Sequence, residues 1–194
     1  MKPVTLKEIL PLDQYEIMRP LLRPLFIAEK NRRRLGVGDH VTLLFENAQT
    51  VWYQIQEMVR TERISAENAI RHEIDTYNEL LPRPGELSAT MLIEYDDATE
   101  RAAALRALVG IERHVWICLG DRREPARFDL RQMATDQVSS VQFVRFPLGG
   151  LEAGELVALA RAGRVAIEID HPRLSARAAV SASLASTLAD DLAA

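Results

Sequence analysis

The stretch SATMLIEYDDATERAAALRALVGIERHVWICL at residues 88–119 decides the fold, because its hydrophobic pattern changes twice. Residues 88–95 form a short apolar run that is typical of a buried strand. The capping box at residues 97–100 predicts a helix that ends at Gly110. Residues 114–119 form a second apolar run. The stretch therefore predicts a strand, a helix and a further strand in succession.

The sequence that follows extends this pattern toward the C-terminus. A weak strand is expected over residues 126–130 and a stronger one over 141–148, followed by a helix over 152–162 and a strand over 165–169. The order β-α-β-(β)-β-α-β resembles a ferredoxin-like (βαββαβ-type), mostly antiparallel sheet with an extra strand. Apolar residues four apart in the tail predict a C-terminal helix that packs back or meets a partner; they are Val180, Leu184, Leu188 and Leu192.

The N-terminal part is predicted to be mainly helical, with a short strand over residues 41–45. A helix is expected from Asp13 to about Leu35, kinked or split by Pro20 and Pro24. Two more helices follow the strand. The fold class is therefore α+β, in a single domain over residues 1–194. Its subregions are a mainly helical part over 1–84, an α/β sandwich over 85–172 and a helical tail over 173–194.

The amino-acid composition limits the functional classes to which this protein can belong. With 24 Lys and Arg residues against 28 Asp and Glu, the net charge is 24 − 28 = −4, which argues against nucleic-acid binding. Cys118 is the single cysteine, so no internal disulfide can form. The N-terminus lacks the apolar core of a signal peptide, and no apolar run is long enough for a membrane span. These features predict a cytoplasmic protein that spans no membrane.

Polar residues at helical spacing predict a binding pocket on the N-terminal helices. Tyr53, Glu57 and Arg60 share one helix, with Arg63 one turn further on, and the next helix presents Glu73 and Tyr77. If the two helices pair, Arg60 or Arg63 could bridge to Glu73. The set is interpreted either as an interhelical ion-pair network or as a pocket for a small ligand, a metal or a peptide; its members are Tyr53, Glu57, Arg60, Arg63, Glu73 and Tyr77.

Two histidines next to strand ends raise the alternative of a divalent metal site. His40 precedes a strand and His171 follows one, and strand ends often meet at one edge of a sheet. Glu46 and Asp170 could supply oxygen ligands, and such a set would suit zinc, iron or manganese. The spacing matches no known metal motif, and the two histidines could equally hydrogen-bond the backbone.

A basic cluster ends the first long helix, where it offsets the negative end of the helix dipole. The alternative is a site for an anion or an acidic partner; the cluster consists of Lys30, Arg32, Arg33 and Arg34.

The run from His40 to Asn47, with Thr50-Val51 and residues 53–58, resembles an uncharacterised bacterial family, domain of unknown function 3501. Further segments that resemble it are Arg60–Ile64, Tyr77-Asn78, Ala89–Glu94 and Ile169–Pro172. Arg83-Pro84-Gly85 departs from the Asp-Gly type of turn expected there, which we interpret as a loop change.

The resemblance implies no established catalytic residues. Genes of this family often neighbour those of rubrerythrin-like and heterodisulfide-reductase-like iron–sulfur proteins. We therefore expect a non-catalytic accessory protein in a redox or peroxide-defence pathway, acting with such a redox partner, and as a homo-oligomer. The helices that carry Glu57, Arg60 and Glu73, together with the C-terminal tail, are the expected contact surfaces. The alternatives are a metal-dependent enzyme with a His/carboxylate site and a small-ligand-binding regulatory module.

Overall fold

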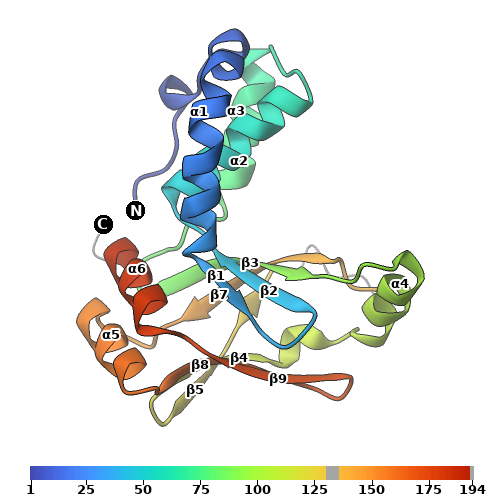
Figure 1. Cartoon of the computed structure of the whole chain (residues 1–194), viewed down its shortest axis with the longest axis vertical. Coiled ribbons are helices and arrows are strands. Elements are labelled where there is room, and N and C mark those ends of the chain that lie inside the picture. Colours follow the sequence, from blue (N-terminus) through green and yellow to red (C-terminus); the bar gives the residue numbers. More distant parts are fainter. Residues whose placement is uncertain (130–135, 193–194) are drawn as a thin grey trace.

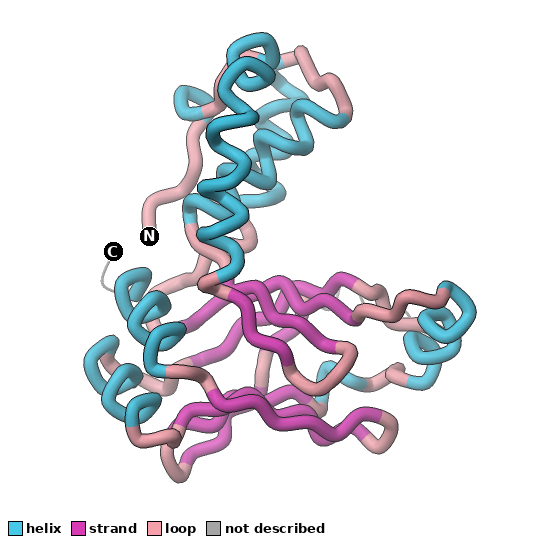
Figure 2. The backbone as a smooth tube through the Cα atoms, in the orientation of Figure 1, coloured by secondary structure: helices cyan, strands magenta, loops and turns pink. Residues whose placement is uncertain are grey.

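The computed structural model describes residues 1–129 and 136–192, and within them the strands form two antiparallel sheets. The five-stranded sheet A has the order β1-β2-β3-β7-β6, and the four-stranded sheet B has the order β5-β4-β8-β9. Figure 2 shows the sheets as two layers below a projecting group of helices. The strands of sheet A are β1 (Arg34–Gly36), β2 (Val41–Phe45), β3 (Glu86–Ile93), β6 (Arg127–Phe128) and β7 (Val141–Pro147). Those of sheet B are β4 (Val115–Leu119), β5 (Arg122–Pro125), β8 (Val165–His171) and β9 (Leu174–Ala179).

The main hydrophobic core lies between the two sheets. In β7, side chains alternate between buried and more exposed positions, so that Val144 and Phe146 face the core. Ile117 and Ile167, which are paired across β4 and β8, meet them from sheet B. The apolar period of each strand thus fixes which face turns inward.

The α+β class is confirmed, but the ferredoxin-like arrangement is not. The expected strands all exist among the described residues, yet they divide between two sheets. β3 pairs with β7, and β4 pairs with β8. Each sheet buries one apolar face against the other, which satisfies the same hydrophobic pattern as a single sheet covered by helices.

The N-terminal helices form a projecting arm above sheet A (Figure 1). The arm contains a short 3-10 turn (Leu6–Glu8) and the helices α1 (Leu12–Asn31), α2 (Ala48–Thr61) and α3 (Glu67–Asn78). A second apolar cluster, which includes Val51, Ile55 and Ile74, holds these helices together.

α1 is continuous from Leu12 to Asn31, so of the two predicted effects of Pro20 and Pro24, a kink or a split, the split does not occur. Both prolines lie on the exposed side of the helix. The carbonyl groups of Glu16 and Pro20, which lose their usual amide partners, can therefore be hydrated.

The remaining helices flank the sandwich. α4 (Ala98–Ala107) begins at Asp97, whose carboxylate accepts from the amides of Thr99 and Glu100, both at 2.8 Å. α5 (Ala153–Arg161) and the predicted C-terminal helix, α6 (Ala182–Leu192), lie side by side at one end of the sandwich (Figure 1). Residues 174–179, expected in the helical tail, instead form the edge strand β9. Alternating small and polar residues, LSARAA, suit an edge strand with one face on the core. No helix in the described part of the chain has the length and apolarity to cross a membrane.

Phe146→Ala is expected to lower the free energy of unfolding by about 3–5 kcal/mol, because it opens a cavity in the core. Phe146 is fully buried and its ring centroid lies 6.1 Å from that of Phe45. The measurement is chemical denaturation. Val141→Ala in the same strand is the control, since Val141 is 41% exposed. Equal losses in the two variants would contradict the placement of the core.

Candidate functional site

An exposed apolar stripe runs along α1. Ile17, Leu21 and Leu25 are 78%, 75% and 66% exposed, and their spacing of four residues places them on one face of the helix. We call these three residues the α1 ridge. Single exposed apolar residues are common on protein surfaces, whereas an exposed stripe of large aliphatic residues is a candidate surface for interaction.

The opposite side of α1 packs on α2 through aromatic rings. The Phe26 ring stacks on Tyr53, with centroids 4.7 Å apart, and on Trp52, with centroids 5.2 Å apart. Tyr15 is fully buried and meets Trp52 edge-on. α1 therefore has a well-packed inner face, and the ridge is left over as a second apolar face.

A polar cluster around Glu57 lies between α1 and α2. Its carboxylate accepts from the Tyr15 hydroxyl at 2.6 Å and from Arg19 Nε at 2.7 Å. The hydrogen bond from Arg19 is the main reason that the pKa of Glu57 lies below its usual value, and burial, which acts in the opposite direction, is outweighed. Burial, followed by the bond to Glu57, raises the pKa of Tyr15. Arg60 Nε lies 3.8 Å from Glu57 Oε1 and Arg60 Nη1 lies 3.7 Å from Glu16 Oε1, and the buried Nε has no hydrogen-bond partner among the described residues.

The structure brings together only part of the predicted pocket. Tyr53, Glu57 and Arg60 face α1. Within the described ranges, Glu73 forms no ion pair with Arg60 or Arg63, so that bridge is not found.

The other predicted pocket residues have local structural roles. Arg63 ends α2 with a left-handed backbone (φ 52°), as the Ile64 amide bonds back to the Val59 carbonyl at 2.9 Å. Tyr77 packs against the apolar cluster of the arm. Sequence reasoning missed Tyr15 and Arg19, although their spacing of four residues on one helix face was visible.

The four predicted metal ligands are engaged in other contacts. The His40 ring stacks on Tyr95 at 3.9 Å between centroids, and its Nδ1 lies 3.1 Å from the Glu94 carbonyl. Glu46 accepts hydrogen bonds from Thr50 and, at 2.6 Å, from Thr90.

Asp170 and His171 belong to sheet B, whereas His40 and Glu46 flank β2 of sheet A. Asp170 accepts from Arg123 at 2.6 Å and from Trp116 at 3.0 Å, and these bonds, the one from Arg123 first, lower its pKa to about 2. His171 Nε2 lies 3.3 Å from the Val109 carbonyl. Among residues 1–129 and 136–192, no three His, Cys, Asp or Glu side chains are arranged to share a metal ion.

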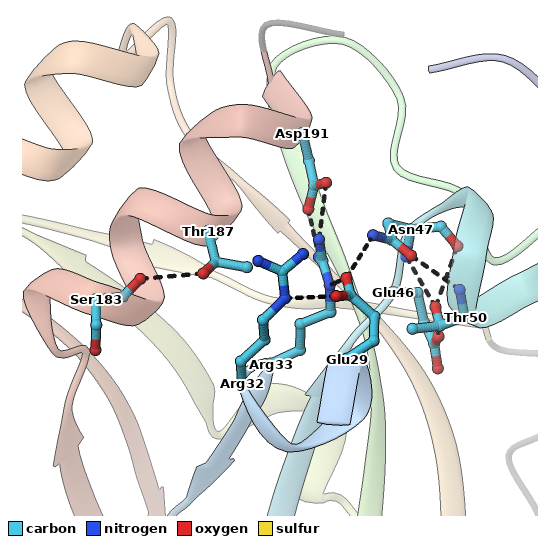
Figure 3. Close-up of polar contacts among 9 residues, drawn as sticks. All are labelled: Glu29, Arg32, Arg33, Glu46, Asn47, Thr50, Ser183, Thr187 and Asp191. Carbon is cyan, nitrogen blue, oxygen red and sulfur yellow. Dashed lines mark hydrogen bonds and ion pairs between the residues drawn. The ribbon is translucent and has the colours of Figure 1, made fainter. Parts of the chain in front are cut away.

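Arg33 joins the arm to the sandwich, as Figure 3 shows. It is 2% exposed, and its Nη1 and Nη2 donate to the two carboxylate oxygens of Asp191 in α6, at 2.5 and 3.0 Å. Its Nε donates to Glu29, which also accepts from Arg32 at 2.5 Å and from Asn47 at 3.1 Å. Burial opposes the charge of Glu29, but the hydrogen bonds from the two arginines outweigh it and hold its pKa below the usual value. Two arginines of the predicted basic cluster, Arg32 and Arg33, thus have acidic partners within the chain.

Asp191→Ala is expected to lower the free energy of unfolding by about 2–3 kcal/mol, because it leaves the buried Arg33 with Glu29 as its remaining partner. The adjacent, exposed Asp190 provides the control, since Asp190→Ala removes the same charge from the same helix. Chemical denaturation of both variants measures the difference. An Asp191→Ala variant with the same free energy of unfolding as wild type would mean that the ion pair between Arg33 and Asp191 does not hold the arm.

Glu57→Gln is expected to make the free energy of unfolding less dependent on pH in the acidic range. A carboxylate whose folded pKa is below its unfolded value of 4.5 stabilises the fold fully above that value, and the contribution is lost as pH falls through the folded pKa. The stability difference between wild type and Glu57→Gln should therefore shrink between about pH 6 and about pH 3. Urea denaturation across this range checks it, with the exposed Glu62→Gln as control. A difference that stays constant with pH would contradict this role of Glu57.

Comparison with known proteins identifies relatives without an established activity. A crystal structure of a novel protein of unknown function from Burkholderia pseudomallei K96243 is 37% identical in sequence, with a TM-score of 0.87 over 98% of this chain and 100% of that one. A search of curated proteins gives no match. The family model described as protein of unknown function (DUF3501) matches residues 3–192. The chain belongs to this DUF3501 family, as the run from His40 to Met58 led us to expect.

Proposed function

We propose that the protein is a non-catalytic accessory protein that docks on a partner protein through the α1 ridge. The observation that carries this proposal is the exposure of Ile17, Leu21 and Leu25 on a helix that is already packed on its other side. The arm holds this ridge away from the sandwich (Figure 1), where a partner surface can reach it.

The size of the ridge suits a transient complex. Burying three large aliphatic side chains contributes roughly 1.5–3 kcal/mol each, or about 4–9 kcal/mol in all, before the cost of association. Met18, which is partly exposed, widens the apolar strip, and Gln14 and Arg23 are exposed polar residues on the same helix. An apolar centre with polar neighbours is the usual anatomy of a protein–protein interface.

The partner in this proposal is an iron–sulfur or rubrerythrin-like protein of a cytoplasmic redox or peroxide-defence pathway. This part of the proposal rests on the family resemblance. It agrees with the chemistry of Cys118, since burial raises the pKa of its thiol and so disfavours the reactive thiolate. The electron-transfer groups would then belong to the partner, and the accessory chain would position or protect them.

The metal-dependent enzyme is the less favoured alternative. His40, Glu46 and His171 are held by neighbouring side chains or backbone carbonyls and are distributed over two sheets. A homo-oligomer that pairs two α1 ridges is a competing use of the same surface, and the experiment below separates it from docking on a redox protein.

Tagged wild-type protein and the double variant Leu21→Gln/Leu25→Gln are to be captured from native cells grown with and without peroxide. We expect wild type to capture a redox protein and the double variant to capture at least about tenfold less of it, since each buried leucine contributes about a kcal/mol or more to binding. Mass spectrometry and the iron content of the eluate identify the partner.

Val141→Gln is the matched control, because it replaces an exposed aliphatic residue of sheet A. Circular dichroism establishes that all variants fold, and size-exclusion chromatography with light scattering reports the oligomeric state. Recovery of no redox protein under either condition, or equal recovery with the ridge variant, would overturn the proposal. A dimer that the ridge variant converts to a monomer would assign the ridge to a second copy instead.

A further inference from the structure

A cleft of about 800 Å³ lies where α3 returns to the outer face of sheet A. One wall is α3 with the loop after it, and the floor is formed by β3, β6 and β7. This region shares no residue with the α1 ridge or with the Glu57 cluster. Its titratable residues are His72, Glu79, Arg83, Arg127, Asp129 and Arg145.

Two arginines lie directly opposite one another in the floor of the cleft. Arg127 of β6 is in register with Arg145 of β7, and Arg145 is in register with Ser88 of β3. Directly opposed residues of an antiparallel pair point to the same face, and like charges in this position destabilise the sheet. A negative group near the pair lowers this repulsion, and an anion in the cleft would be such a group.

Arg145 is fixed in place by the protein itself. Its guanidinium donates to the Leu81 carbonyl at 3.2 Å, to the Glu79 carbonyl and to the Glu86 carboxylate. These bonds hold its charge at the base of the cleft. Glu86 balances that charge, which leaves Arg83 and Arg127 as the other two guanidinium groups of the lining.

Arg83 and Arg127 have no ion pair and no side-chain hydrogen bond among the described residues, and both are exposed. The two carboxylates of the lining, Glu79 and Asp129, are engaged in contacts of their own. Two guanidinium groups, each able to bind an oxyanion with two parallel hydrogen bonds, are thus left for a ligand.

We propose that this cleft binds a small polyanion, a molecule with at least two phosphate or carboxylate groups. Arg83 and Arg127 bind one oxyanion group each, and His72 and Thr76, one helical turn apart on α3, face the same space. Phe143, on the same face of β7 as Arg145, provides apolar contact for the body of the ligand. The volume falls in the range of sites for small metabolites.

Titration calorimetry at low salt with inorganic pyrophosphate and with citrate tests the proposal and separates the two oxyanion classes. Wild type is expected to bind at least one of them. Arg83→Gln/Arg127→Gln should weaken this binding by at least about tenfold, because hydrogen bonds between charged groups are lost. Both side chains are exposed and unpaired among the described residues, so the variant is expected to fold, which its melting temperature checks.

Arg106→Gln/Arg161→Gln is the matched control, since it removes the same charge from exposed positions on α4 and α5. It should bind as wild type does. Absence of heat with both anions at millimolar concentration, or an equal loss of affinity in both double variants, would overturn the proposal. These outcomes leave docking by the α1 ridge unaffected, because that surface contributes no residue to the cleft.

Discussion

The buried guanidinium of Arg33 is the contact on which the position of the arm depends. It lies where α1 ends and sheet A begins, and it binds carboxylates from α1 and from the C-terminal helix. A buried charge with one partner removed is strongly destabilising, so the three groups must be present together. The hydrogen bond from Asn47 to Glu29 adds the start of α2 to the same network. These polar contacts join the arm to the sandwich together with one apolar contact, since Phe143 of β7 packs against the apolar cluster of the arm.

The two surfaces proposed to bind other molecules differ in shape and in polarity. The α1 ridge is apolar and convex, and it belongs to a helix whose packing is complete without it. The cleft is concave and contains three arginines, of which Arg127 and Arg145 are in an arrangement that the sheet alone would disfavour. In both cases the sequence departs from what folding by itself requires. Such departures are where function is expected in a chain whose other local choices agree with the fold.

Local patterns in the sequence predicted most helices and strands, because these depend on hydrophobic period and capping residues. The strand at residues 141–147 and the helix that begins after Asp97 are examples. Distribution of the strands over two sheets was not predictable in this way, since one apolar face per strand fits either a sandwich or a sheet covered by helices. The strand at 174–179 was missed because its small residues carry little hydrophobic signal. Local patterns also could not predict contacts between distant segments of the site. Tyr53, Glu57 and Arg60 were predicted from their spacing on one helix. Their partners Tyr15 and Arg19 lie on another helix, and no local pattern connects the two.

The contact between Arg33 and Asp191 joins residues that are 158 positions apart, and Asp191 is among the last residues of the chain. During synthesis, α1 to α3 leave the ribosome long before α6 exists. The nascent arm can form its own small core, but Arg33 has no second carboxylate until α6 has been synthesised. Final locking of the arm therefore waits for α6, and a chain terminated before α6 would keep a loosely attached arm that quality-control proteases can recognise.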